Sequence, residues 1–233
     1  MSGVTFLNLA LLQIPGMESP DLSAGEWMAQ IWEDGGFMMW PLGLCLAVGI
    51  GIIIWKLIDL SVTSSRTKKV LREVDERLAA RDIPGAIEAA RSSNTPAGRI
   101  LLAGLERHHE GSERVMKAIE NVGLIQMAGL ESGLVWLATI ANVAPLLGFL
   151  GTVIGMIQAF QNIEAAGEVE ATLVAGGIKV ALITTAAGLT IAIPINIMHN
   201  YFVTRVDRLV IDMEESAQKM IDTLQEIEAG VRA

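Results

Sequence analysis

Three threonine hydroxyls lie in long segments of otherwise apolar or small residues. Thr184 and Thr185 stand side by side in residues 179–202, which read KVALITTAAGLTIAIPINIMHNYF, and Thr152 lies in an earlier segment. A hydroxyl in an apolar helix either bonds a carbonyl of its own helix or lines the path of an ion. The residues alone favour the first reading, because threonine is common in tight helix interfaces. Adjacent residues on a helix point about 100° apart, so at most one of Thr184 and Thr185 points straight into a given cavity.

Small residues recur around these hydroxyls. Gly148, Thr152, Gly155 and Ala159 have the same spacing as Ala181, Thr185, Gly188 and Ala192. Residues three and four apart share one helix face, and small ones let a neighbouring backbone approach closely. Each proline in these segments removes a backbone hydrogen bond, which helix bundles and wet cavities tolerate. We predict a helix-packing or pore face made of Gly148, Gly151, Gly155, Ala181, Gly188, Ala192, Pro145 and Pro194.

Lys179 is the only charged residue in the third apolar segment. A charge at mid-membrane costs at least about 2.5–3.5 kcal/mol. Two readings stay open. Either the lysine extends toward the outer membrane surface, or it faces the interior of a bundle as an electrostatic element.

Long uncharged runs predict the elements that position these residues. Gly35–Trp55, Ser132–Ile163 and Val180–Thr204 contain no charged side chain, and each exceeds the roughly 20 residues that a spanning helix needs. We therefore expect an all-α membrane protein with three transmembrane helices and long cytoplasmic helical extensions.

Basic residues are distributed unevenly along the chain. Residues 1–55 contain no Lys or Arg, whereas most basic residues lie between Lys56 and Lys117. The positive-inside rule then places the N-terminus outside and the C-terminus in the cytoplasm. The expected divisions are an extracytoplasmic segment 1–37, spans 38–60, 131–162 and 171–203, a cytoplasmic helical domain 61–130, an extracytoplasmic turn 163–170 and a cytoplasmic helix 204–233.

The polar segments carry their own helix signals. Asp82 is a candidate N-cap, Pro96–Glu110 is predicted helical, and Ser112 is predicted to cap a helix that is able to run unbroken into the second span. The residues Val206, Val210, Met213, Ala217, Met220, Leu224 and Ile227 form a heptad seam. Such a seam requires a neighbouring helix, either from the chain's own polar domain or from another chain.

The sequence lacks the residue patterns that several kinds of catalytic and binding site require. The single cysteine, Cys45, permits no disulfide or Cys-x-x-Cys site within one chain, and no GxxxxGK[ST] motif is present. No nucleophile–base pair stands out. We expect no enzyme, no cofactor, no metal and no nucleic-acid partner.

Three stretches carry a resemblance to a known family. They are GGFMMWPLGLC at 35–45, APLLGFLGTVIGMIQAFQ at 144–161 and GGIKVALITTAAGLTIAIPINIMHNYF at 176–202. Together they resemble the MotA/TolQ/ExbB proton channel family, in particular its ExbB and TolQ branch, over about residues 35 to 225.

The resemblance implies an ion-driven motor of the bacterial inner membrane. Family members form a ring of five subunits around two copies of a single-span partner of the ExbD/TolR type, whose aspartate carries the proton. The complex transmits proton-motive force to a TonB- or TolA-like protein. The pore threonines of the family fall on Thr152 and Thr185, and Thr184 is a further candidate for lining the ion pathway.

One position departs from the family pattern. Many ExbB and TolQ proteins have a glutamate where this chain has Val180, next to Lys179. This departure and the extra hydroxyl at Thr184 leave sodium open as the ion and leave a gliding-type or other surface machine open as the system. A structural membrane scaffold is the alternative from another class. A solute transporter is disfavoured, because three spans without an inverted repeat suit alternating access poorly.

Overall fold

The computed structural model describes residues 24–168 and 170–232, and within them it contains helices and turns but no strand. The helices are α2 (Ala24–Asp34), η1 (Gly36–Met38), α3 (Met39–Ala79), α4 (Ile83–Ser92), α5 (Pro96–Leu105), η2 (His108–Glu110), α6 (Ser112–Glu131), α7 (Leu134–Ala166) and α8 (Ala171–Arg232). The chain divides into two compact units, which are described separately. The predicted extracytoplasmic segment 1–37 lies largely outside the described residues.

Among the residues that the structure describes, three helices are long and apolar enough to cross a membrane. These stretches are Gly36–Ala79, Leu134–Ala166 and Val174–Ile227, with mean hydropathy of 2.3, 1.9 and 1.9 in their most apolar windows. The predicted all-α fold with three spans is therefore confirmed. Pro145 and Pro194 lie inside α7 and α8, which remain continuous helices at both positions.

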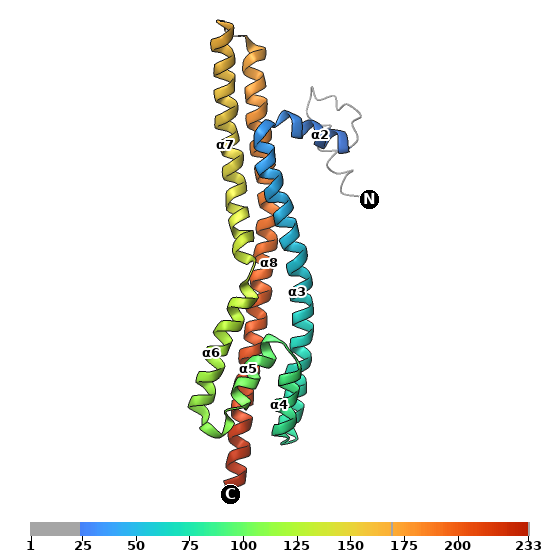
Figure 1. Cartoon of the computed structure of the whole chain (residues 1–233), viewed down its shortest axis with the longest axis vertical. Coiled ribbons are helices and arrows are strands. Elements are labelled where there is room, and N and C mark those ends of the chain that lie inside the picture. Colours follow the sequence, from blue (N-terminus) through green and yellow to red (C-terminus); the bar gives the residue numbers. More distant parts are fainter. Residues whose placement is uncertain (1–23, 169, 233) are drawn as a thin grey trace, which may run out of the picture. The chain divides into compact units, whose positions relative to one another are not determined.

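The first unit comprises the chain up to Gly43 together with Pro145–Leu189. It holds α2, η1, the beginning of α3, most of α7 and the first part of α8 (Figure 1). The helices α7 and α8 run antiparallel here, joined by a short turn in which Gly167 has a φ of 75°. A positive φ is accessible to glycine at little cost, so this residue allows the chain to reverse direction at that point.

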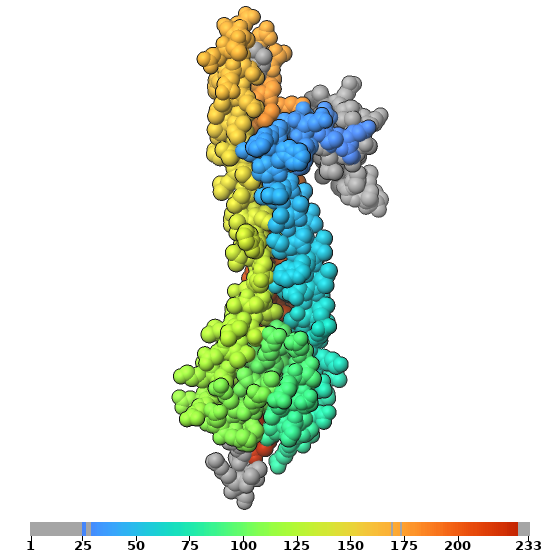
Figure 2. Space-filling model, in the orientation of Figure 1, coloured from blue at the N-terminus to red at the C-terminus, as the bar shows by residue number. Residues whose placement is uncertain are grey.

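The second unit comprises Leu44–Ala144 together with Thr190–Ala233. Here α4, α5 and α6 pack in succession, and Figure 2 shows them (green) as one continuous surface. Asp82 accepts a hydrogen bond from the backbone N–H of Gly85, which confirms it as the N-cap of α4, and Thr95 caps α5 in the same way through Gly98. These caps satisfy backbone donors that a helix start leaves unpaired.

The heptad seam of α8 packs within this unit. Val206, Met213, Ala217, Met220 and Leu224 are all buried. Gly104 of α5 lies against Met220, and a side-chain carbon at that glycine would fall 2.5 Å from the methionine methyl group. Lys219 Nζ contacts Asp75 Oδ2 of α3 at 2.6 Å beside the seam. Of the two readings of the seam, the structure shows packing on the chain's own polar domain.

Two helix ends differ from the sequence prediction. The helix predicted over Pro96–Glu110 ends at Leu105, and a separate 3₁₀ turn, His108–Glu110, follows it. The helix from Ser112 does not run unbroken into the second span, because it ends at Glu131 and α7 begins at Leu134. Gly133 has a φ of 87° at this break, a conformation that ends a right-handed helix.

The break is held by a buried lysine. Lys56 of α3 has a side chain that is 0% exposed, and its Nζ donates a 2.9 Å hydrogen bond to the Ser132 carbonyl. Asp59 Oδ2 lies 3.6 Å from the same nitrogen. The ring of Trp55 lies against Gly133, where a side-chain carbon would fall 2.9 Å from it. The lysine thus satisfies a carbonyl that the helix end leaves without a partner.

Candidate functional site

The predicted small-residue faces meet in the first unit. Gly148, Gly151 and Gly155 of α7 are buried, as are Ala181 and Gly188 of α8. A side-chain carbon at Gly148 would lie 2.9 Å from the Thr184 carbonyl oxygen, and one at Gly155 would lie 2.7 Å from the Gly177 carbonyl oxygen. Such distances leave no room for a side chain, so the two backbones are in direct contact. Glycine is therefore a packing requirement on this face.

Thr184 lies inside this helix pair. Its side chain is 0% exposed, and a side-chain carbon at Gly151 would fall 2.4 Å from its hydroxyl. The hydroxyl is 3.0 Å from both the Val180 and the Ala181 carbonyl oxygens, so its proton always has an acceptor in its own helix. With its hydrogen bond made to its own helix, Thr184 faces the neighbouring helix α7.

Thr185 and Thr152 lie at the edge of the helix pair, and both are half-buried. The Thr185 hydroxyl is 3.3 Å from the Gly148 carbonyl oxygen of α7 and 3.2 Å from the Ala181 carbonyl oxygen of its own helix. The Thr152 hydroxyl donates to the Phe149 carbonyl at 2.6 Å. Both hydroxyls thus bond backbone carbonyls while keeping part of their side chains at the surface of the unit.

Lys179 has a partner that the sequence did not reveal. Its Nζ lies 2.6 Å from Asp34 Oδ2, the last residue of α2, and the two side chains are 54% and 28% exposed. The ion pair ties α2 to the beginning of α8. An acidic residue directly before the first span was the available signal, but its distance along the chain from Lys179 gave no reason to pair them.

The remaining predicted residues differ in their burial and in the unit to which they belong. Pro145 is half-buried in α7 of the first unit. Ala192 and Pro194 belong to the second unit, where Ala192 is buried and Pro194 is exposed. Val180 is half-buried, and its carbonyl accepts a hydrogen bond from Thr184.

The helix pair carries no carboxylate along its hydroxyl-bearing faces. From Pro145 to Leu189 the acidic residues are Glu164, Glu168 and Glu170, all at the turn between the two helices. Within the described residues, no group of three or more His, Cys, Asp or Glu side chains is placed to hold a metal ion. Threonine hydroxyls and backbone carbonyls can solvate an ion or bond a carboxylate, but they do not store a proton at neutral pH.

Comparison with known proteins gives one family. The profile of the MotA/TolQ/ExbB proton channel family matches residues 92–215. The biopolymer transport protein exbB1 of Vibrio cholerae is 30% identical over 72% of this chain and 76% of its own length. An ExbB-like biopolymer transport protein of Synechocystis is 37% identical over 68% of this chain and 64% of its own.

A biopolymer transport protein ExbB homolog of Methanothermobacter thermautotrophicus is 31% identical over 82% of this chain and 68% of its own length. The profile covers more than half of the chain and includes the hydroxyl-bearing helices α7 and α8 through Glu215. The described part of the chain also contains three helices that are able to cross a membrane. The chain is therefore an inner-membrane protein and belongs to the MotA/TolQ/ExbB proton channel family.

Proposed function

We propose that this chain is the ring-forming subunit of an ion-driven motor, and that its ion pathway runs past Thr152 and Thr185. The motor includes an ExbD/TolR-like single-span partner and energises TonB- or Tol-dependent work at the cell envelope. The ring is a homopentamer around a partner dimer, as the family resemblance implies. One observation carries the proposal: two half-exposed hydroxyls lie on a helix pair that has no carboxylate beside them.

The proton carrier in this proposal belongs to the partner. A relay needs a group that gains and loses a proton near neutral pH, and the hydroxyl-bearing faces of α7 and α8 offer none. An aspartate on a partner helix supplies that group. Each elementary charge that crosses the membrane gains about 2.3 kcal/mol per 100 mV, so transfer of a few protons supplies work comparable to a conformational change.

Of the two edge hydroxyls, that of Thr185 is the better suited to contact such a carboxylate. The Thr185 hydroxyl has two neutral acceptors at 3.2 and 3.3 Å, beyond the usual optimum for an O–H donor. A hydrogen bond to an ionised carboxylate is shorter and about twice as strong, so rotation of the hydroxyl toward the partner is favourable. Thr184 is fully buried and bonded to its own helix, so we assign it to packing in the assembled ring.

We also propose the orientation that the charge pattern predicts. The second unit contains most of the basic residues, including exposed Arg66, Lys68 and Lys69. On the positive-inside rule its polar helices lie in the cytoplasm, and Lys179 with Asp34 lies at the opposite side of the membrane. In this orientation the chain acts by conducting ions across the membrane.

Co-purification and ion flux test the proposal. The full chain is co-expressed with an ExbD/TolR-like single-span protein and reconstituted in liposomes. We expect a complex of five copies with two partners, and ion flux that disappears when the partner's membrane aspartate is changed to asparagine. Flux followed against a sodium gradient and with a protonophore identifies the ion. A chain that assembles without any ion dependence would instead support the structural scaffold.

A gliding-type or other surface machine is the alternative motor assignment. The observation that favours it is Val180, which replaces the glutamate of many ExbB and TolQ proteins beside Lys179. Deletion of the gene separates the two systems. Loss of TonB-dependent uptake or of envelope integrity supports the first, and loss of surface motility with normal uptake supports the second.

A further inference from the structure

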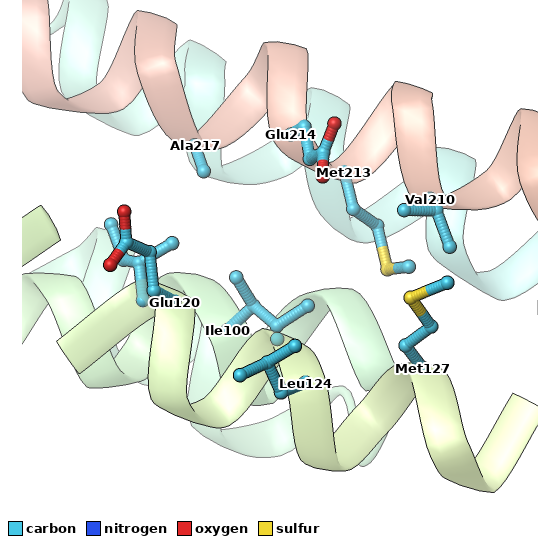
Figure 3. A pocket seen from close by; sticks show the side chains of 10 residues that line it. Ile100, Glu120, Leu124, Met127, Val210, Met213, Glu214 and Ala217 are labelled. Carbon is cyan, nitrogen blue, oxygen red and sulfur yellow. The ribbon is translucent and has the colours of Figure 1, made fainter. Parts of the chain in front are cut away.

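A cavity of about 320 Å³ opens in the second unit between α5, α6 and α8. Its lining is mostly apolar, and Figure 3 shows Met127 of α6 and Met213 of α8 pointing toward each other across the opening. Two carboxylates, Glu120 and Glu214, also line it, and no basic residue does. Methionine side chains adapt their shape to an inserted group, and the carboxylates favour a group that carries positive charge.

The carboxylates of the cavity form no ion pair within the described part of the chain. Neither Glu120 nor Glu214 forms an ion pair with any residue that the structure describes, and both are exposed. Beside them, Leu124 of α6 is 69% exposed. A large exposed apolar side chain next to an apolar cavity indicates a surface that is covered in the assembled protein.

One face of α3 has the complementary character. The buried side chains of its polar half are Leu60, Thr67, Val70, Leu71, Val74 and Leu78. At 3.6 residues per turn, Val62 and Lys69 point to the opposite side of the helix. Val62 is 43% exposed, and exposed Lys69 forms no ion pair with any described residue. This face therefore presents an apolar side chain and a free cation away from its own chain, and it cannot reach its own cavity.

The α3 face and the cavity lie at the same height in the unit. The hydrogen bond from Lys56 to the Ser132 carbonyl sets α3 level with the end of α6. At about 1.5 Å per residue, Lys69 lies about 20 Å from Lys56 along α3, and Glu120 lies about 18 Å from Ser132 along α6. Both distances run away from the contact in the same direction. The contact between Asp75 of α3 and Lys219 of α8 sets these two helices level in the same way. Lys69 lies about 9 Å before that contact along α3, and Glu214 lies about 8 Å before it along α8.

Equal height is what a ring requires. In a ring whose axis is the membrane normal, every copy sits at the same depth, and one surface of each copy contacts a different surface of the next. We infer that the Val62–Lys69 face of α3 docks into the Met127–Met213 cavity of a second copy, with Lys69 between Glu120 and Glu214. This inference rests on the proposed ring and identifies the contact that closes it.

Disulfide trapping in the full-length protein tests the contact directly. Val62→Cys and Met127→Cys are introduced together after the native Cys45 is changed to serine, and membranes are oxidised. A contact between unlike surfaces gives a ladder of cross-linked species that ends at the size of the ring. A species that stops at the dimer would overturn the contact, because it shows two like surfaces facing each other.

Charge exchange tests the recognition without disturbing the helix cores. Lys69→Glu places three like charges together, and we expect at least roughly tenfold less ring in native mass spectrometry. Adding Glu120→Lys and Glu214→Lys restores the ring. Lys68→Glu is the matched control, because it makes the same charge change about 100° away around the helix and is expected to leave the ring intact.

The outcomes separate this contact from the ring itself. If the unmodified chain forms no oligomer with its partner, the proposed ring fails. If the ring forms but gives no cross-link and Lys69→Glu behaves like Lys68→Glu, the α3 contact is overturned and the ring stands. Retention of a lipid or of a peptide of the single-span partner in the cavity of the intact ring would overturn the contact as well.

Discussion

The two units hold their helices together in opposite ways. In the first, α7 and α8 touch through glycine and alanine, and backbone meets backbone. In the second, α8 packs through large side chains such as Met220 and Leu224, against partners such as Gly104. Small-residue packing is effective in lipid, where burying an apolar side chain against protein gains little free energy. In water, burial of large apolar side chains contributes the most free energy.

The two kinds of packing occupy different parts of one continuous helix, α8, and suit different functions. Where it packs by small residues it carries hydroxyls and a single ion pair, and it is suited to lining an uncharged path. Where it packs by large residues it carries free charges and an open cavity, and it is suited to recognising other surfaces. A smaller side chain should therefore be destabilising in the second unit, and a larger one should be destabilising in the first.

The largest expected effect is the loss of a large side chain in the second unit. Met220 is 1% exposed, and Met220→Ala should lower stability by about 2–5 kcal/mol, because it removes buried contacts and leaves a cavity. The apparent melting temperature of the purified protein measures this loss. Met116→Ala is the control, because it removes the same atoms from a side chain that is 40% exposed. This variant should change the melting temperature little.

The converse change should be costly in the first unit. Gly155→Ala adds a single methyl group where a side-chain carbon would lie 2.7 Å from the Gly177 carbonyl oxygen, and we expect a loss of about 1–3 kcal/mol. Gly51→Ala is the control, because no heavy atom lies within 4 Å of the added carbon in the described structure. Equal melting temperatures for both variants would contradict close backbone packing.

A smaller effect is expected at the break between α6 and α7. Lys56→Met keeps the apolar stem but removes the hydrogen bond to the Ser132 carbonyl, at a cost of about 1 kcal/mol. Hydrogen exchange should become faster around Gly133. Lys68→Met, at an exposed lysine, is the control. Similar hydrogen exchange in both variants would show that Lys56 does not stabilise the break between α6 and α7.

The smallest effect concerns the ion pair of the first unit. Asp34→Asn and Lys179→Met should each cost less than about 1 kcal/mol, because Lys179 is more than half exposed and solvent screens the pair. A double-mutant cycle on melting temperature isolates the pairing energy. A coupling of several kcal/mol would mean that the pair is more deeply buried in the assembly than in the single chain.

Sequence patterns predicted the spans because charge exclusion is a local property. Residues such as Gly35–Trp55 identify a membrane helix without reference to the rest of the chain. The spacing of small residues does not determine which side of each helix meets its neighbour. Gly148, Gly151 and Gly155 satisfy helical spacing as well as Gly148, Thr152 and Gly155 do, so spacing could not tell which threonine lies inside.

The missed features depend on contacts between distant segments. The partner of Lys179 is Asp34, and the acceptor of Lys56 is the Ser132 carbonyl, and neither pair has a local signal. Lys56 was read only as a basic residue at a membrane end. The break at Gly133 was missed because helix-forming residues continue on both sides of it.

Ion flux through the reconstituted complex tests the central claim most directly. Thr185→Val, Thr152→Val and Thr184→Val each replace a hydroxyl by a methyl group of similar size, and flux is measured per assembled complex. We predict that the variants at Thr185 and Thr152 lose most of the flux with assembly intact, that Thr185→Ser retains it, and that Thr184→Val conducts normally once assembled. Unchanged flux in both edge variants would contradict an ion pathway past Thr152 and Thr185.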